Sequence, residues 1–425
     1  MPIPRLFSRL AALTLGLTLI FPPVSVQAAS AKLKMEAQTA PSPVTAPYID
    51  TAAYLQTARH LRQLGCDTQT LYSLWNRFGQ QMDRLLNSGT LTEETLLFLL
   101  PDNSQGDLLD RYLAYGQLNP ELSAQEIVTQ VNMGLDFPFY QNISLCPQPD
   151  SLTVLVNKYN QLPGDYVPQL EPLGSQYGKG SLHPQAAQAF RQMADAAAAD
   201  GLRLQSVSAY RSYSTQTGLY RNYVNQSGQT TADTFSAQAG HSEHQTGLAL
   251  DINVARTSAH FENTAEFSWL QEHCSQFGFI LRYPQGKDAI TGYRFEPWHY
   301  RYVGTEIAQI CMEQNLTYEE YLAALPSNPA PAVEWLDQEY TVDGLLMGGS
   351  LYLSPARLCP ALGWSVQQRQ NGLQLSGNGQ TLLLVPGFCV LKDGTLHRLS
   401  LPALLLENTL FLSSADLSYL LAPPL

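Results

Sequence analysis

The segment Gly240–Ile252 constrains the fold of this chain more than any other stretch. Along residues 248–253, apolar side chains alternate with polar or small ones, which is the period of a strand with one buried face. Asp251 then points away from the core. Gly247 permits a bend that returns the preceding His244 toward Asp251. An imidazole and a carboxylate brought together in this way are ligands of the kind that zinc prefers.

A second segment, Phe295-Glu296-Pro297-Trp298-His299-Tyr300, follows about fifty residues later. A catalytic zinc site needs a third protein ligand and an open position for water, and we assign His299 as that ligand. Glu296 is close enough in sequence to act as general base toward a zinc-bound water. In a straight strand Glu296 and His299 point to opposite faces, so we predict a turn or bulge at Pro297. The segment is not a helical HExxH motif, which excludes the helical zincins.

An arginine in a third segment, Ser208–Gln216, completes the predicted site. Arg211 follows a predicted strand and precedes a predicted helix, where a side chain can reach over a sheet face. Its guanidinium would stabilise an oxyanion or hold a substrate carboxylate. Taken singly, each motif also has a structural interpretation, such as a packed histidine or a surface arginine. The order and spacing of all three segments together favour a zinc centre.

Residues 150–315 resemble the D-alanyl-D-alanine carboxypeptidases of the VanY type. These enzymes are zinc peptidases of family M15, in a wider group that includes D,D-dipeptidases, L,D-carboxypeptidases and the zinc fold of Hedgehog proteins. The matching motifs are Ser208-Ala-Tyr-Arg211-Ser, Ser242-Glu-His244-Gln-Thr-Gly247-Leu-Ala-Leu-Asp251 and Glu296-Pro-Trp-His299. No metal or base position departs from the family pattern.

The resemblance implies a role for each matching residue. It assigns one Zn²⁺ ion to His244, Asp251 and His299, and general base catalysis to Glu296. It also assigns Arg211 to the transition state or the substrate carboxylate. The residues that it implies in substrate contact are Ser242, Gln216 and Arg211.

The reaction that the resemblance implies is zinc-dependent removal of the terminal D-residue from peptidoglycan stem peptides. An L,D-carboxypeptidase, a D,D-dipeptidase or an endopeptidase of the same fold stays open, because these enzymes share the metal motifs and differ in their loops. A third hypothesis is a non-catalytic zinc protein that binds the cell wall. The presence of Glu296 favours an enzyme, since a purely structural zinc protein needs no general base.

The chain exceeds the length that one core usually organises, so we expect several domains. The predicted fold class is α+β, with a central antiparallel sheet and flanking helices. The predicted parts are a signal peptide (1–29), a flexible leader (30–47), a helical domain (48–150), the catalytic domain (151–318), a linker (319–338) and a C-terminal module (339–425). Within the catalytic domain we predict strands at 152–156, 204–209, 248–253 and 279–283, and helices at 183–199, 215–225 and 263–276.

The C-terminal module repeats one design, a short strand that ends at a serine able to cap a leucine-rich helix, near residues 351–362 and 410–421. Between the two copies, Gly377-Asn378-Gly379 predicts a hairpin. The module resembles the N-terminal-like repeat domain of copper amine oxidases. Since the segment lacks a ligand cluster, the resemblance implies a non-catalytic role.

The first thirty residues predict export. Arg5 and Arg9 precede an uncharged run that ends at small residues, in the order of a secretory signal. We therefore expect a secreted or wall-associated protein, with an uncleaved N-terminal anchor as the alternative. A formal net charge of −12 argues against nucleic-acid binding and against tight binding to anionic membranes. An even cysteine count permits disulfides, and we suggest the pairs Cys66–Cys146, Cys274–Cys311 and Cys359–Cys389.

Overall fold

The computed structural model describes residues 51–327 without a break, together with 33–34, 332–335, 338–341, 344–347, 350–369, 372–406 and 409–421. The predicted signal peptide lies outside these residues, as does the predicted leader apart from Leu33–Lys34. Contacts divide the described chain into two compact units. The central unit is Asn103–Ala324, and the terminal unit combines residues from Met1–Asp102 and Leu325–Leu425.

A four-stranded antiparallel sheet forms the middle of the central unit. Its strands, in spatial order, are β6 (Gln205–Ser208), β7 (Ala249–Asn253), β9 (His299–Tyr302) and β8 (Phe279–Leu281). The alternation read from the sequence places Leu250 and Ile252 in the core, where both side chains are fully buried. The predicted α+β class with a central antiparallel sheet is confirmed.

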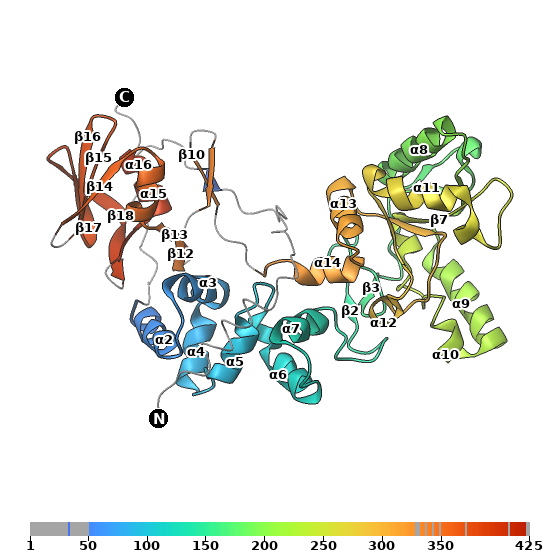
Figure 1. The fold of residues 1–425 in the computed structure, drawn as a ribbon, viewed down its shortest axis with the longest axis horizontal. Helices are drawn as coiled ribbons and strands as arrows, with labels where there is room; N and C mark the ends of the chain where they lie inside the picture. The colour runs from blue at the N-terminus through green and yellow to red at the C-terminus, as the bar shows by residue number, and fades with distance from the viewer. Residues whose placement is uncertain are drawn as a thin grey trace. The chain divides into compact units, whose positions relative to one another are not determined.

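Helices cover the apolar face of this sheet. The Ala-rich helix α8 (Pro184–Ala199) and the helix α11 (Ala265–His273) lie against it, and their side chains share one core cluster with those of β7 (Figure 1). The small alanine side chains let α8 approach the sheet closely, and Phe190 fills the space between them with no exposed surface. The polar face of β7, which carries Asp251, is not covered by these helices and faces the predicted metal site.

The remaining elements of the central unit are helices and two-residue strands. Its other α-helices are α6 (Leu109–Leu118), α7 (Ala124–Asn132), α9 (Tyr213–Ser227), α10 (Gln229–Ala232), α12 (Asp288–Thr291), α13 (Thr305–Glu313) and α14 (Tyr318–Ala324). The 3-10 helices are η1 (Gly106–Leu108), η2 (Ser175–Tyr177), η3 (Glu243–Thr246), η4 (Phe261–Asn263) and η5 (Cys274–Phe277). Two-residue strands are β2 (Ser144–Leu145), β3 (Asn160–Gln161), β4 (Glu171–Pro172) and β5 (Ser181–Leu182).

The predicted strand at 152–156 is wrong. Its carbonyl oxygens bond to side chains in place of a neighbouring strand. The hydroxyl of Tyr318 donates to the carbonyl of Thr153 at 2.7 Å, and Arg301 donates to those of Leu152 and Val154 at 3.2 and 2.8 Å. The segment is therefore an irregular strap pinned by buried polar groups. The predicted helix 263–276 is α11 followed by the separate 3-10 turn η5.

The terminal unit joins helices from residues 51–99 to a large β-sheet. Its helices are α2 (Thr51–Gln63), α3 (Thr68–Phe78), α4 (Gln80–Asn87), α5 (Glu93–Leu99), α15 (Pro355–Ala361) and α16 (Ser414–Leu421). The strands of its eight-stranded antiparallel sheet, in spatial order, are β12 (Gly344–Met347), β13 (Ser350–Leu353), β19 (Thr409–Ser413), β18 (Thr395–Leu406), β17 (Gly387–Lys392), β16 (Gln380–Leu384), β15 (Gly372–Gly377) and β14 (Ser365–Arg369). A separate three-stranded sheet contains β1 (Leu33–Lys34), β10 (Ala332–Trp335) and β11 (Gln338–Thr341).

Hydrogen bonds show which segments each contact unit joins. On α3, Asn76 donates to the carbonyl of Gly344 at 2.6 Å and accepts from the N–H of Leu346 at 3.0 Å, which ties α3 to β12. By contrast, α7 belongs to the central unit, where Asn132 and Asn103 both donate to the carbonyl of Ala323 at the end of α14. The predicted boundaries at 150, 318 and 338 stay predictions.

The structure confirms two predicted details of the C-terminal module. Asn378 and Gly379, both with positive φ, join β15 to β16 in the predicted hairpin. At the second repeat, the hydroxyl of Ser413 accepts from the N–H of Asp416 at 3.1 Å and caps α16 as expected. At the first repeat, Ser354 precedes α15 but its side chain makes no capping bond.

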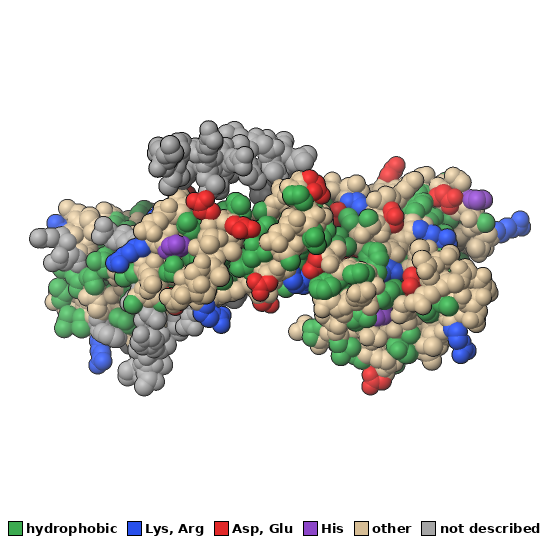
Figure 2. Space-filling view, turned by 90° about the horizontal axis from the view of Figure 1, so that it is seen from below, with side chains coloured by type: hydrophobic (Ala, Val, Ile, Leu, Met, Phe, Trp, Pro, Cys, Tyr) green, Lys and Arg blue, Asp and Glu red, His purple; other side chains and the backbone are tan. Residues whose placement is uncertain are grey.

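The disulfide prediction is wrong for this structure, in which all six cysteines are free. Cys66 and Cys146 fall in different units, and the Cys146 thiol donates to the carbonyl of Leu155 at 3.4 Å. In the described part of the chain, no helix is long and apolar enough to cross a bilayer. On the face seen in Figure 2, Lys and Arg side chains lie singly or in small groups, without a continuous basic patch.

The packing of α8 on the sheet predicts how a core substitution changes the free energy of unfolding. Replacing Phe190 with Ala leaves a cavity in the main core of the central unit, so the free energy of unfolding should fall by about 3–5 kcal/mol. Leu118→Ala, at an 81% exposed position on α6, is the control and should change it by less than about 0.5 kcal/mol. Urea denaturation, with hydrogen exchange of the β7 and β9 amides, measures both. Equal effects of the two changes would contradict this account of the core.

Candidate metal centre

Strand register brings two of the predicted ligands together. Asp251 on β7 lies directly opposite His299 on β9, so both side chains project from the same face of the sheet. Ser208 on β6 is the partner of Asp251 on its other side. The site is thus built on the central strands, where backbone hydrogen bonds on both sides fix the side-chain directions.

The third ligand comes from the turn that leads into β7. His244 lies in η3, which ends at Gly247 in the left-handed conformation with a φ of 68°. A Cβ atom at Gly247 would come within 3.0 Å of the backbone nitrogen of His183, so both the conformation and the space favour glycine. Nδ1 of His244 donates to the carbonyl of Ala209 at 2.7 Å, which leaves Nε2 facing Asp251.

The distances within the cluster suit one tetrahedral ion. Oδ1 of Asp251 lies 3.5 Å from Nε2 of His244 and 3.5 Å from Nδ1 of His299. Two ligand atoms bound at zinc distances to one tetrahedral ion would lie roughly 3.3 Å apart. Oδ1 is buried and accepts no hydrogen bond, an arrangement that a bound cation would satisfy. One donor atom from each residue lies within 4.8 Å of the others, so the donor set fits the predicted zinc.

The charges around the cluster also favour a cation. Burial opposes ionisation of Asp251, yet the neighbouring His244 and His299 lower its pKa well below the usual range. Burial likewise opposes the protonated form of His299, but the neighbouring carboxylates of Asp251 and Glu243 raise its pKa to about 9. The surroundings that hold a proton on His299 would equally stabilise a metal ion bound to its Nδ1.

Glu296 reaches the same centre through the predicted turn. Pro297 and Trp298 form a turn in which the N–H of His299 donates to the carbonyl of Glu296 at 3.1 Å. Oε2 of Glu296 then lies 3.8 Å from Nδ1 of His299, the nitrogen that faces the cluster. The predicted bend at Pro297 is confirmed. Burial raises the pKa of Glu296 to about 7, against the opposing effects of His299 and the more distant Arg294 and Arg211.

The other predicted site residues lie in the same cavity. Arg211 donates to Oε1 of Gln216 at 2.9 Å and to the hydroxyl of Ser208 at 3.0 Å, and it lies 3.8 Å from Oδ2 of Asp251. Gln216 is 2% exposed, and its Nε2 donates to the carbonyl of Ala237. Both polar ends of Gln216 are therefore engaged by the protein, which indicates that it positions Arg211. Ser242 lines the cavity as well.

A buried ionic cluster behind His299 was missed by the sequence reasoning. Glu243 accepts from Nε of Arg282 at 2.7 Å and from Nη1 of Arg301 at 3.0 Å, and its Oε2 lies 3.4 Å from Nε2 of His299. Arg282 also donates to both carboxylate oxygens of Glu319 on α14, at 2.6 and 2.8 Å. Burial opposes the charge of Glu243, but the two guanidinium groups hold its pKa well below the usual range. The only signal in the sequence was the position of Glu243 next to His244.

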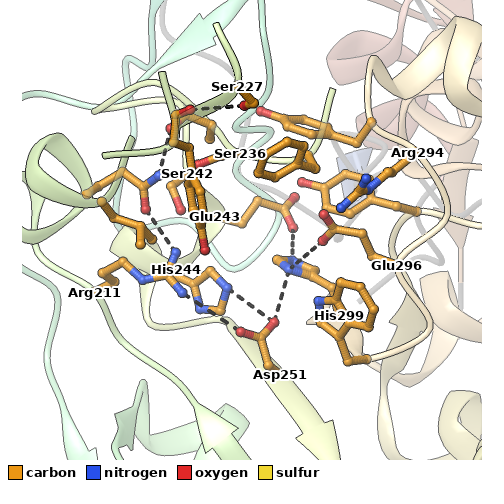
Figure 3. Close-up of a pocket in the computed structure, with 18 of the residues that line it drawn as sticks. Arg211, Ser227, Ser236, Ser242, Glu243, His244, Asp251, Arg294, Glu296 and His299 are labelled. Atoms are coloured by element: carbon orange, nitrogen blue, oxygen red, sulfur yellow. Dashed lines mark hydrogen bonds and ion pairs between the residues drawn. The ribbon is translucent and has the colours of Figure 1, made fainter. Parts of the chain in front are cut away.

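The predicted site residues and Glu243 line one cavity of about 450 Å³. Figure 3 shows His244, Asp251 and His299 turned toward one another, with Glu296 beside His299 and Arg211 beside His244. Trp298, Tyr283 and Tyr293 add aromatic walls. The volume suits a ligand of a few residues. The arrangement provides a metal site, a base and a cation within one enclosure.

Comparisons with known proteins place this cavity in a family. Residues 179–305, which include the predicted metal ligands and the base, match the model of VanY, D-alanyl-D-alanine carboxypeptidase. The chain is 40% identical over 184 residues to "Putative carboxypeptidase YodJ" of Bacillus subtilis (strain 168), covering 41% of this chain and 67% of that protein. It belongs to the VanY family of D-alanyl-D-alanine carboxypeptidases, which are metallopeptidases.

Two further relatives carry the VanY name or activity. The D-alanyl-D-alanine carboxypeptidase of Enterococcus faecalis (strain ATCC 700802 / V583) is 38% identical over 178 residues, which cover 40% of this chain and 65% of that protein. A solved structure of a vancomycin-resistance D,D-pentapeptidase VanY variant in complex with Zn(II) is 37% identical, covers 40% of this chain and 98% of that chain, and has a TM-score of 0.37. The chain thus spans about two thirds of the length of the two curated relatives.

Removal of single ligands tests the metal centre. The purified protein should contain one zinc ion per chain by elemental analysis, and His244→Ala or His299→Ala should each reduce that content severely, because two remaining ligands hold zinc weakly. His260→Ala, which changes an exposed imidazole outside the cavity, is the control and should leave it unchanged. Full zinc content in both ligand variants would contradict the assignment.

Glu243 gives a second prediction. Glu243→Gln keeps the shape but leaves Arg282 and Arg301 without a full counter-charge, so the free energy of unfolding should fall by about 3–5 kcal/mol. Zinc affinity should fall about 10–100-fold, because His299 loses the carboxylate that orients its ring. Chelator competition and urea denaturation measure the two effects. The control is Glu262→Gln, which changes a surface pair with His260. If Glu243→Gln behaved like this control, the buried cluster would have no positioning role.

Proposed function

We propose that this chain is a zinc-dependent carboxypeptidase that removes the terminal D-alanine from peptidoglycan stem peptides ending in D-alanyl-D-alanine. One observation carries the proposal: the opposed pair Asp251 and His299 shares a cavity with His244, and the carboxylate of Glu296 lies 3.8 Å from the metal-facing nitrogen of His299. Membership of the VanY family supports the type of reaction. The similar VanY structure in complex with Zn(II) supports the choice of metal.

His244, Asp251 and His299 would hold the zinc ion. When bound there, zinc supplies Lewis acidity that lowers the pKa of water and polarises a carbonyl group. Glu296 accepts a proton from the attacking water and delivers it to the amine that leaves. Its pKa of about 7, raised by burial, suits a group that must both take and release a proton near neutral pH.

Arg211 interacts with negative charge on the substrate. It is held by Gln216 and Ser208 on the side of the cavity next to His244 and Asp251. From this position its guanidinium stabilises the charge that develops on the carbonyl oxygen or binds the terminal carboxylate. Ser242 contributes a polar group to the same wall.

An L,D-carboxypeptidase or D,D-dipeptidase activity is the alternative within the same fold, because the metal ligands and base would be the same. A non-catalytic wall-binding protein is disfavoured by the presence of Glu296, which a zinc site without chemistry does not need. Export through the segment 1–29 is part of the proposal, since stem peptides lie outside the cytoplasm. We also propose that residues 339–425 form a non-catalytic repeat module of the type named after the N-terminal part of copper amine oxidases.

Glu296→Gln tests the catalytic assignment. The variant should keep one zinc ion per chain and lose about 10²–10⁴-fold in kcat, because the amide cannot accept a proton. Mass spectrometry of a pentapeptide ending in D-Ala-D-Ala measures the released D-alanine. Glu262→Gln, on the surface outside the cavity, is the control. Full activity of the zinc-loaded Glu296→Gln variant would contradict the role of Glu296 as general base. A native enzyme that cut only tetrapeptides would instead support the L,D-carboxypeptidase activity.

A further inference from the structure

Arg294 is a cation in the cavity that the proposed reaction does not use. It lies on the loop between α12 and β9, two residues before Glu296, and its exposed side chain lines the cavity. Its Cζ atom is 4.5 Å from the centroid of the Phe235 ring. Phe235 packs edge-on against Tyr223, with 5.1 Å between the ring centroids, and the N–H of Arg294 donates to the carbonyl of Thr234 at 2.9 Å. The guanidinium is therefore supported on one face by an aromatic platform.

The other arginines at this site have carboxylate partners. Arg211 lies 3.8 Å from Asp251, and both Arg282 and Arg301 bond to Glu243. Within residues 51–327, the guanidinium of Arg294 forms no ion pair and donates no side-chain hydrogen bond, and it packs over the ring of Phe235. A guanidinium stacked by its face keeps its N–H edges available for a planar anion.

Arg294 and Arg211 bracket the predicted metal ligands. Figure 3 shows Arg211 on one side of His244, Asp251 and His299, and Arg294 on the other side, next to Glu296. A peptide whose terminal carboxylate lies near Arg211 and whose scissile bond lies at the metal would extend toward Arg294. The neutral side chains Tyr223, Ser227 and Phe235 line the cavity with Arg294, and the neighbouring carboxylate of Glu296, which lies 3.8 Å from Nδ1 of His299, forms no ion pair with Arg294.

We propose that Arg294 binds a second carboxylate of the substrate, on the N-terminal side of the bond that is cut. The inference rests on the proposed carboxypeptidase function and adds a substrate class to it: peptides that carry an additional anionic group. Two N–H groups of a guanidinium match the two oxygens of a carboxylate, and the stacked geometry reduces the ordering needed on binding. Arg294 thus acts as a specificity determinant.

Stem peptides offer this carboxylate from two sources. One is the free α-carboxylate of a γ-linked D-glutamate, and the other is the side-chain carboxylate of a diamino diacid at the next residue. Four pentapeptides L-Ala-γ-D-Glu-X-D-Ala-D-Ala separate them. X is L-lysine or meso-diaminopimelate, and in each case the α-carboxyl of the glutamate is either free or amidated.

The experiment measures kcat/KM for D-alanine release from the four peptides by the full chain and three variants. Arg294→Gln removes the charge, and Arg294→Lys keeps the charge without the planar fork. Arg221→Gln changes an exposed arginine on α9 outside the cavity and is the control. We expect the native enzyme to prefer one peptide that carries the additional carboxylate over the partner peptide that lacks it by about 10–100-fold, the range of a charge-assisted hydrogen bond. Arg294→Gln should lower kcat/KM mainly for the peptide with that carboxylate and so abolish the preference, and Arg294→Lys should fall between.

The outcomes separate this inference from the proposed function. The preferred pair of peptides identifies the source of the carboxylate. If the native enzyme releases D-alanine equally from all four peptides, or if Arg294→Gln lowers all four rates by one factor, the inference is wrong and the carboxypeptidase function stands. If none of the four peptides loses D-alanine, both are overturned. The preference should also weaken with added salt, because an exposed guanidinium is screened.

Discussion

The buried carboxylate of Glu243 is the interaction on which the rest of the site depends. It lies between two guanidinium groups with almost no exposed surface, and it contacts the ring of His299. Burying Arg282 or Arg301 alone would cost several kcal/mol, so each charge is tolerable only because the others are present. Glu319 on α14 completes the balance, with two carboxylates for two guanidinium groups. Removing any one member leaves an uncompensated charge beside the metal ligands.

This cluster links the outer parts of the central unit to the direction of one imidazole ring. His299 and Arg301 are two residues apart on β9, so both project from the same face and both reach Glu243. Tyr300, between them, points into the core and is fully buried. Arg301 also bonds to the strap at 152–156, which fixes that strap in turn. The strap, α14 and β9 thus contact the same cluster of charged groups. This cluster fixes the orientation of the His299 ring in the absence of a ligand.

The parts predicted from the sequence were those encoded locally. The alternation along β7 fixed the face of Asp251, Gly247 marked the bend that returns His244, and the odd spacing of Glu296 and His299 required the turn at Pro297. The cluster of Glu243 could not be predicted, because its members are spread along the sequence from Glu243 to Glu319 and look like ordinary polar positions of strands and helices. The same cluster explains the wrong strand at 152–156. There, a run of β-branched and apolar residues satisfied the pattern of a strand, but its carbonyls bond to side chains that no local pattern reveals.

The distribution of charge in the cavity explains how one small space can serve ions of both signs. Carboxylates gather at the floor, where Asp251, Glu243 and Glu296 surround His299, and this is where a divalent cation would be stabilised. Guanidinium groups lie at either side, with Arg211 held by a carboxylate and an amide and Arg294 held by an aromatic face. A substrate anion bound directly over the carboxylates would be repelled, so the separation of the two kinds of charge matters. In the proposed function, the two lateral cations would hold a peptide by its charges while its uncharged amide bond lies over the centre.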